Sequence, residues 1–187
     1  AFEDQARTEG YTCICGIDEA GRGPLAGPVY AAAVVLRPGQ VIEGVNDSKK
    51  LSEKKREALF DTICSQCAAY GIGSATEKEI DEINILNATY LAMQRAVAAL
   101  PVQPDCALVD GNRAPDLPLE VRTIIKGDAQ SASIAAASIL AKVSRDRYML
   151  QMAEKYPQYA FEKHKGYGTK LHYERLEQYG ILSLIHI

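Results

Sequence analysis

Residues 16–28 have the sequence GIDEAGRGPLAGP, in which four glycines and two prolines fall within thirteen positions. An apolar run at residues 13–18 leads into this segment, and a longer run, VYAAAVVL at residues 29–36, follows it. Short apolar runs bounded by Gly and Pro are typical of buried strands, and the connection between them must take an unusual backbone path. Asp18 and Glu19 therefore lie at the end of a strand, where the chain changes direction.

Hydrophobic periodicity and capping residues indicate further elements along the rest of the chain. We expect strands at 70–75, 106–109 and 121–125, helices at 52–67, 85–100, 131–155 and 169–179, and a loop at 161–168. Strands that come first and then alternate with helices are typical of an α/β domain with a mixed sheet.

The composition is that of an ordinary globular chain. Of the 187 residues, 47% are hydrophobic and 24% are charged, and the formal net charge is −3. This length predicts one domain, and no apolar run approaches the ~18 residues of a membrane span, so we expect no membrane partner. The slight acidity argues against a surface that binds nucleic acid everywhere, but it is compatible with a local basic groove.

The cysteines indicate a reducing compartment. The chain has five of them, an odd number, and Cys64-x-x-Cys67 has no second Cys pair or His cluster that would complete a zinc site. We therefore expect reduced, partly buried thiols in a cytoplasmic protein.

The two ends lack the features of native termini. The chain starts at Ala1 without a signal peptide, and the apolar tail at residues 182–187 has no turn or capping residues. The tail is similar to a translated sequencing adaptor. We expect a single domain at residues 1–181, truncated at both ends, and a non-native tail at 182–187; a genuine C-terminal strand is the alternative.

Acidic residues follow three of the expected strands, as Asp18-Glu19, Asp110 and Asp128. In an α/β sheet, sites form at the carboxyl ends of strands. Four carboxylates that meet there would repel one another and raise one another's pKa. A divalent cation relieves that repulsion, and a site made only of oxygen ligands favours Mg²⁺ or Mn²⁺.

Each acid also has an ordinary structural interpretation. An Asp before Gly is commonly a turn residue, as Asp110 could be, and an Asp just before a helix, such as Asp128, commonly caps it. Asp18 and Glu19 would point to opposite faces of a regular strand unless the glycines bend the chain. The joint pattern is stronger than any one residue and favours the metal site.

Six sequence blocks together resemble bacterial ribonuclease HII. The first is residues 16–28, and the others are NDSKKLS at 46–52, VDGN at 109–112, KGD at 126–128, SILAKVSRD at 138–146 and HKGYGT at 164–169. The resemblance spans about residues 10–180, and GRGP at 21–24 favours ribonuclease HII over ribonuclease HIII. It implies an α/β, ribonuclease H-like fold: a mixed five-stranded sheet, with three antiparallel neighbours and two further parallel strands, and helices packed on both faces.

The resemblance also implies an activity. Asp18, Glu19, Asp110 and Asp128 match the family's catalytic, metal-binding acids, which hold two Mg²⁺ or Mn²⁺ ions during catalysis. The implied enzyme is a metal-dependent endonuclease of ribonucleotide excision repair and DNA replication. It cuts the RNA strand of RNA/DNA hybrids and the 5′ side of ribonucleotides embedded in duplex DNA, leaving 3′-OH and 5′-phosphate ends. We expect it to act as a monomer in the cytoplasm.

Substrate-binding residues are implied in the same way. Gly21, Arg22 and Gly23 match the family segment that recognises the 2′-OH, and glycine lets a backbone approach a ligand closely. Tyr167 matches the tyrosine that stacks on the sugar next to the ribonucleotide; a hydrophobic plug for its loop is the alternative. The other expected substrate contacts, some of which are otherwise ordinary solvated side chains, are Asn46, Ser48, Lys49, Lys50, Ser138 and Lys142.

Further basic residues could line a groove or simply face solvent. They are Lys142, Arg145 and Arg147 in the expected helix 131–155, and Lys163, Lys165 and Lys170 after it. His164 and His172 fall outside the acids in the sequence, and we expect His172 to be a surface or structural residue.

Two other functions stay open. A general metal-dependent nuclease of the same fold would need neither the Gly-Arg-Gly segment nor Tyr167. A catalytically weak fragment that only binds hybrids is the second alternative. The four acids argue against it, because carboxylates near phosphate weaken binding and give a pure binder nothing in return.

Overall fold

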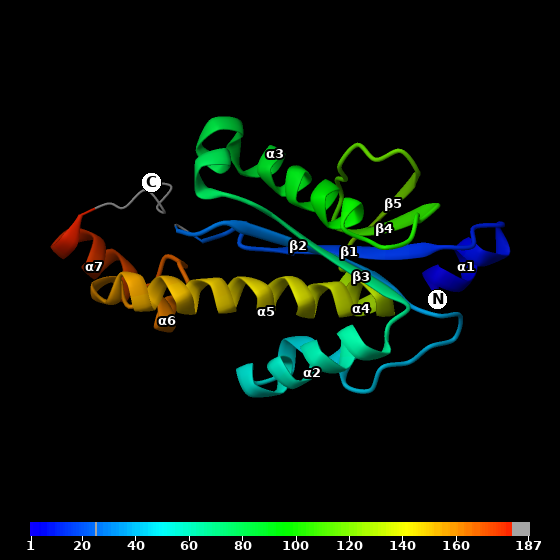
Figure 1. Ribbon diagram of the computed structural model, residues 1–187, viewed down its shortest axis with the longest axis horizontal. Helices are drawn as coiled ribbons and strands as arrows, with labels where there is room; N and C mark the ends of the chain where they lie inside the picture. The colour runs from blue at the N-terminus through cyan, green and yellow to red at the C-terminus, as the bar shows by residue number, and fades with distance from the viewer. Residues whose placement is uncertain (25, 181–187) are drawn as a thin grey trace.

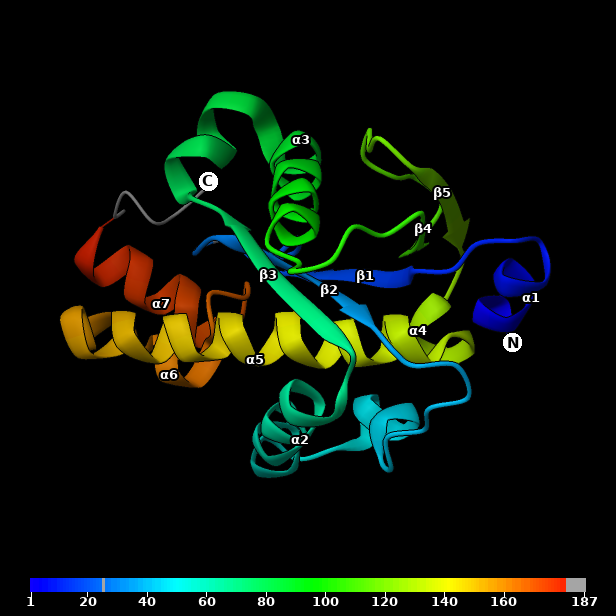
Figure 2. The same cartoon turned by 45° about the vertical axis from the view of Figure 1, so that its right-hand side comes forward.

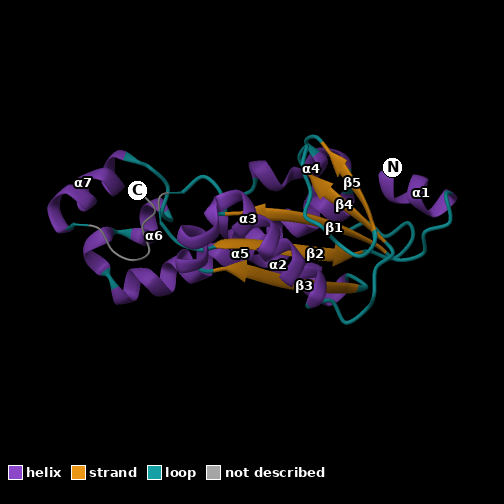
Figure 3. Cartoon of the chain, turned by 90° about the horizontal axis from the view of Figure 1, so that it is seen from above, coloured by secondary structure: helices purple, strands orange, loops and turns teal. Residues whose placement is uncertain are grey.

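The computed structural model describes residues 1–24 and 26–180, and for residues 47–49 it describes the backbone only. The tail at 182–187 lies outside the described residues. Five strands form one mixed sheet in the order β3-β2-β1-β4-β5 (Figures 1 and 3). They are β1 (Ile14–Ala20), β2 (Val29–Val35), β3 (Ala69–Ala75), β4 (Cys106–Asp110) and β5 (Glu120–Ile124). The pairs β1–β2 and β2–β3 are antiparallel, and β1–β4 and β4–β5 are parallel, which confirms the expected fold.

Helices cover both faces of this sheet (Figure 2). Because neighbouring residues of a strand point to opposite faces, Ala31 and Ala33 of β2 pack toward α3 (Glu77–Ala98), while Ala32 and Val34 pack toward α5 (Ala132–Lys155). Helix α2 (Glu53–Gln66) joins α5 on that second face. The sheet is thus buried on both sides, as the continuous apolar run of β2 predicts.

Small residues allow α3 to lie close to the sheet. A Cβ added to Gly71 or Gly73 of β3 would come within 2.2 Å of the Ala96 carbonyl oxygen or 2.4 Å of the Ala92 carbonyl oxygen. Any larger residue at these two positions would push the helix away from the strand. The alanine content of β2 and α3 serves the same close packing.

The remaining helices are short. They are α1 (Phe2–Thr8), α4 (Gly127–Gln130), α6 (Phe161–His164) and α7 (Lys170–Tyr179), with 3₁₀ turns at Val45–Lys50 (η1) and Pro157–Tyr159 (η2). Helix α1 was not expected from the sequence, and α6 lies within the expected loop 161–168. One-turn helices such as α4 and α6 are too short to give a periodic signal.

Helix α3 begins at Glu77, not at the expected residue 85. Its start is fixed by a capping box: Thr76 Oγ1 accepts from the Glu79 N–H at 3.2 Å, and Glu79 Oε1 accepts from the Thr76 N–H at 3.0 Å. Asn84 then leaves the helical conformation, with φ 71° and ψ 168°. This kink interrupts the periodicity, so the sequence pattern reveals only the part of α3 that follows it.

All five cysteines are free thiols, three of them buried. Among the described residues, no helix is both long and apolar enough to cross a membrane.

Candidate active site

Two parallel strands bring the first three acids together. Ile17 of β1 pairs with Val109 of β4, so Asp18 and Asp110, each one residue further on, lie side by side where the β1–β4 ladder ends. Asp18 is buried, and Glu19 and Asp110 are half-buried. The carboxyl ends of these strands therefore form an acidic edge, as the sequence pattern predicts.

The fourth acid is brought to this edge by a turn that Asp110 itself holds. Asp110 Oδ1 accepts the backbone N–H of Gly127 at 2.5 Å and that of Asp128 at 3.4 Å. Glycine at 127 allows this close approach, because a Cβ there would lie 2.7 Å from Ile134 Cδ1 and 3.2 Å from Asp110 Oδ1 and would displace these side chains. Asp128, in the first turn of α4, is buried beside Asp110. Asp110 thus lies at a turn and Asp128 at the start of a helix, as their ordinary structural interpretations predict. Both also belong to the acidic cluster.

The carboxylates of this acidic edge repel one another. Burial raises the pKa of Asp18 well above its ordinary value, and repulsion by Glu19 and Asp110 raises it further. Burial also raises the pKa of Glu19, and Asp110 adds to that rise, while the guanidinium of Arg22 opposes it. Within the described part of the chain, Glu19 Oε2 is buried and has no hydrogen-bond partner.

The chemical nature of these four side chains fits a divalent cation. The donors are all carboxylate oxygens, and those of Asp18, Glu19 and Asp110 repel one another when ionised. Among the described residues, no group of three or more His, Cys, Asp or Glu side chains lies close enough together to hold a metal ion. The arrangement is therefore an open acidic edge rather than the closed shell of a structural metal site.

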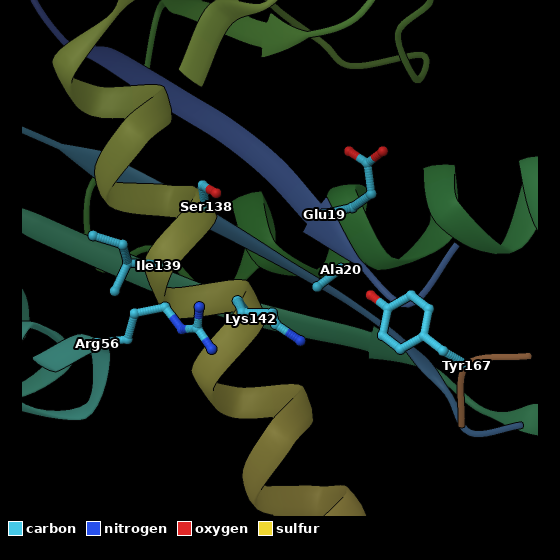
Figure 4. Close-up of a pocket in the computed structure, with 7 residues that line it drawn as sticks. All are labelled: Glu19, Ala20, Arg56, Ser138, Ile139, Lys142 and Tyr167. Carbon is cyan, nitrogen blue, oxygen red and sulfur yellow. The ribbon is translucent and has the colours of Figure 1, made fainter. Parts of the chain in front are cut away.

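A pocket lies next to the acidic edge (Figure 4). Glu19 of β1, Arg56 of α2, Ser138 and Lys142 of α5, and Tyr167 from the loop after α6 line it. Ser138 and Lys142 are one helical turn apart and face the same space. Lys142 Nζ lies 5.4 Å from the centre of the Tyr167 ring. The structure thus joins three of the expected substrate contacts to Glu19, and it adds Arg56, which the sequence analysis missed.

Positions 21 and 23 are both occupied by glycine, but for different reasons. Gly21 has φ +101°, and a Cβ there would come within 2.4 Å of Arg145 Nε, so the fold itself requires glycine. Among the described residues, a Cβ at Gly23 would meet only the Tyr167 ring, at an ordinary 3.9 Å. The fold tolerates a side chain at 23, so a glycine there leaves space for something outside the chain. Arg22, between them, is exposed.

Residues 15–186 match the family model of ribonuclease HII. The chain belongs to the ribonuclease HII family. It is 60% identical to ribonuclease HII of Caldicellulosiruptor bescii over 179 residues, which cover 96% of this chain and 87% of the relative. As a member of this family it is an endonuclease of the ribonuclease H type, a hydrolase of phosphodiester bonds.

Solved structures give the same result for the fold. The ribonuclease H2 of Pyrococcus horikoshii superimposes with a TM-score of 0.78 at 28% identity, covering 94% of this chain and 92% of that one. Bst-RNase HIII, solved in complex with Mn²⁺, superimposes with a TM-score of 0.76 at 18% identity and covers 96% of this chain and 66% of its own. The ribonuclease H-like fold is shared with both.

Arg145 does not line a basic groove. Its side chain is fully buried and donates to the carbonyls of Pro28 at 3.1 Å, Ala26 at 2.6 Å and Lys165 at 2.5 Å. Arg145 therefore links residues 26 and 28, which follow the Gly-Arg-Gly segment, to the loop that carries Tyr167. Sequence spacing places a residue on a helix but does not show whether the helix face it occupies is covered by distant loops.

Two more of the basic residues that could line a groove or face solvent are paired with acids of α2. Arg147 forms an ion pair with Glu57 at 2.6 Å, and Lys165 forms one with Glu53 at 3.3 Å. Lys163 and Lys170 are exposed.

The expected phosphate contacts in η1 are only partly described. Asn46 and Lys50 are exposed, as such contacts need to be. The side chains of Ser48 and Lys49 lie outside the described residues.

The two histidines hold the loop that carries Tyr167 in place. His164 and His172 are buried and stack on each other, with ring centres 4.0 Å apart. The Gly166 N–H donates to His164 Nδ1 at 3.0 Å, and His172 Nδ1–H donates to the Tyr167 carbonyl at 2.9 Å. Burial lowers the pKa of both rings, so the pair is neutral at physiological pH. His172 is structural, one of the two interpretations offered by the sequence.

Proposed function

We propose that this endonuclease hydrolyses the RNA strand of RNA/DNA hybrids and cuts on the 5′ side of ribonucleotides embedded in duplex DNA, leaving 3′-OH and 5′-phosphate ends. One observation carries the proposal. Glu19 of the acidic edge and Tyr167 line one pocket, and the ring of Tyr167 also faces Gly23 of the Gly-Arg-Gly loop. Residues suited to phosphodiester hydrolysis therefore lie beside residues suited to recognising a 2′-OH.

In this proposal, Asp18, Glu19, Asp110 and Asp128 hold two divalent cations, Mg²⁺ or Mn²⁺. When bound, such ions would lower the pKa of an attacking water and stabilise the departing 3′ oxygen. The oxygen-only donor set and the raised pKa values of Asp18 and Glu19 support this assignment. The related fold of Bst-RNase HIII, solved with Mn²⁺, is consistent with it.

The neighbouring residues select the substrate. At Gly21 and Gly23 the backbone can approach the 2′-OH, which both donates and accepts hydrogen bonds, and Arg22 faces the adjacent phosphate. Tyr167 stacks on the sugar next to the ribonucleotide. The proposed phosphate contacts are Asn46, Ser48, Lys49, Lys50, Ser138 and Lys142.

We also propose that residues 1–181 are one catalytic domain that acts as a monomer in the cytoplasm. The single continuous sheet supports the domain assignment. The five free thiols support a reducing compartment.

The first test is cleavage of a labelled DNA duplex that carries one ribonucleotide, with Mg²⁺ or Mn²⁺. We expect a metal-dependent cut on the 5′ side of the ribonucleotide. An all-DNA duplex and the Asp18→Asn variant are the controls, and neither should show the cut. Equal cutting of the all-DNA duplex would instead indicate a general nuclease. Retained binding without cutting would indicate the binding-only alternative.

A further inference from the structure

Arg56 stands out from the basic run that surrounds it in α2. Lys54 and Lys55 are exposed, as expected for the wet face of a helix, whereas the Arg56 side chain is only 23% exposed and lines the pocket with Glu19 and Lys142. Figure 4 shows its guanidinium beside Lys142, with Glu19 across the pocket. A charged side chain that is this buried normally has strong partners.

The partners of Arg56 are weak. Its Nη1 donates to the Leu51 carbonyl at 3.4 Å, and its Nη2 lies 4.0 Å from Asp146 Oδ2. Within the described part of the chain, its Nε is buried without a hydrogen-bond partner. A guanidinium carries five N–H donors, so most of the donor capacity of Arg56 is unused.

Other arginines of this region have stronger partners. Arg145 donates to three backbone carbonyls, and both Nε and Nη2 of Arg147 donate to Glu57. The underused guanidinium is therefore particular to Arg56 and is not a general property of the arginines near α5.

The carboxylate that faces Arg56 is shared with Lys142. Asp146, whose side chain is 5% exposed, accepts from Lys142 Nζ at 3.0 Å on Oδ1 and faces Arg56 with Oδ2. Two cations thus share one carboxylate, which leaves an excess positive charge on the pocket wall opposite Glu19. An anion in the pocket would meet this charge and the free donors of Arg56 together.

We propose that Arg56 is a further phosphate-binding residue of the substrate site, which forms with Lys142 a two-cation subsite for a backbone phosphate, and that Asp146 orients both cations. The inference rests on the proposed function, since a nucleic-acid duplex is the source of the phosphate. A planar guanidinium with free donors suits the oxygens of a phosphate, which it can bind through two parallel hydrogen bonds. The distance to Asp146 is loose enough that the phosphate need not displace a strong ion pair.

The test is the salt dependence of duplex binding. It is measured by fluorescence anisotropy with a ribonucleotide-containing duplex in the Asp18→Asn background, where the substrate is bound but not cut. Arg56→Gln keeps a polar stem of similar shape and removes the charge. Each phosphate contact contributes about 0.9 to the slope of log affinity against log salt, so the slope should fall by about one unit. Over about a fourfold increase in salt, the variant should then lose about fourfold less affinity than the parent protein.

Two further variants make the result specific. Arg56→Lys keeps the charge but not the planar fork, so it should restore the slope while its affinity stays below that of the parent. Lys78→Ala removes one charge from α3, on the opposite face of the sheet, and should leave the slope unchanged. Thermal unfolding of each variant verifies that it is folded.

A structural role for Arg56 would change stability or affinity without changing the salt slope. If Arg56→Gln keeps the parent slope, Arg56 does not bind phosphate and the inference is wrong. This outcome is distinct from failure of the proposed function, which would show as no ribonucleotide-dependent cleavage by the unmodified protein.

Discussion

Glu3 in α1 and Asp18 at the end of β1 are both buried carboxylates near the start of α5, yet their surroundings differ. Glu3 Oε1 accepts from Ser131 Oγ at 2.5 Å, from Ser133 Oγ at 2.7 Å and from the Ser133 N–H at 3.0 Å. Asp18 accepts the Glu19 N–H at 2.8 Å and otherwise faces the charges of Glu19 and Asp110. One carboxylate has donors around it, and the other has further carboxylates.

The pKa values differ accordingly. Burial raises the pKa of Glu3, but the hydrogen bonds from Ser131 and Ser133 outweigh it, so this pKa lies below its ordinary value. Burial and repulsion act in the same direction on Asp18, whose pKa is raised. Glu3 therefore stabilises the fold as a carboxylate and fastens α1 to α5, whereas Asp18 destabilises the metal-free fold when ionised. A satisfied carboxylate anchors structure, and an unsatisfied one is available to a ligand.

The sharpest test of this contrast is Asp18→Asn. Loss of metal-assisted transition-state stabilisation amounts to several kcal/mol, so cleavage should slow by about a thousandfold or more. The metal-free variant should nevertheless melt at a higher temperature than the metal-free parent, because one of the repelling charges is gone. Cleavage assays and melting in a chelator measure the two effects. A variant that is both inactive and less stable would contradict the contrast.

Metal removal gives the next largest effect. A cation present at about 100 times its dissociation constant stabilises a folded protein by about 2.7 kcal/mol, which corresponds to about 5–10 °C in a chain of this length. We expect Mg²⁺ or Mn²⁺ to raise the melting temperature of the parent protein and of Glu3→Gln equally. The rise should be much smaller in Asp18→Asn. If the cation raises the melting temperature of all three proteins equally, it binds at a site other than the acidic edge.

Glu3→Gln should show the reverse of Asp18→Asn. Loss of charge-assisted hydrogen bonds to the two serines should lower the free energy of unfolding by about 1.5–3 kcal/mol, measured by urea denaturation. Cleavage at temperatures well below the unfolding transition should stay close to that of the parent. A folded Glu3→Gln protein without activity would show that the two carboxylate regions are coupled.

The pH dependence provides the smallest but most direct comparison. Because the pKa of Glu3 is lowered, its stabilisation is present above about pH 4.3, the ordinary value for Glu, and is lost as the pH falls through the folded-state pKa. The difference in folding stability between the parent protein and Glu3→Gln should therefore become smaller as the pH falls. Because the pKa of Asp18 is raised, protonated Asp18 favours the fold below its ordinary pKa, and this advantage is lost as the pH rises. The extra folding stability of metal-free Asp18→Asn over the metal-free parent should therefore increase as the pH rises. Melting curves across the acidic range test both slopes.

Much of the fold and the site could be predicted from local sequence. The apolar run of β2, the capping residues Ser52 and Thr169, and the strand-end positions of Asp18 and Asp110 are patterns within a few neighbouring residues. Backbone conformation and face alternation depend mainly on such neighbours, so these expectations are confirmed. The ordered motif blocks also sufficed to identify the family.

The sequence alone determined the order of the strands and helices, the acids that follow the strands, and the family. Only the tertiary structure decided the partners of its buried polar groups. Glu3 meets serines 128 and 130 positions away, and Arg145 meets a carbonyl 117 positions away. Whether a charged side chain is solvated, satisfied or left short of partners depends on which distant segments pack against it. That is why the sequence predicts Arg145 either in a groove or in solvent although it is buried, and why Arg56 and Glu3 carry no signal in the sequence.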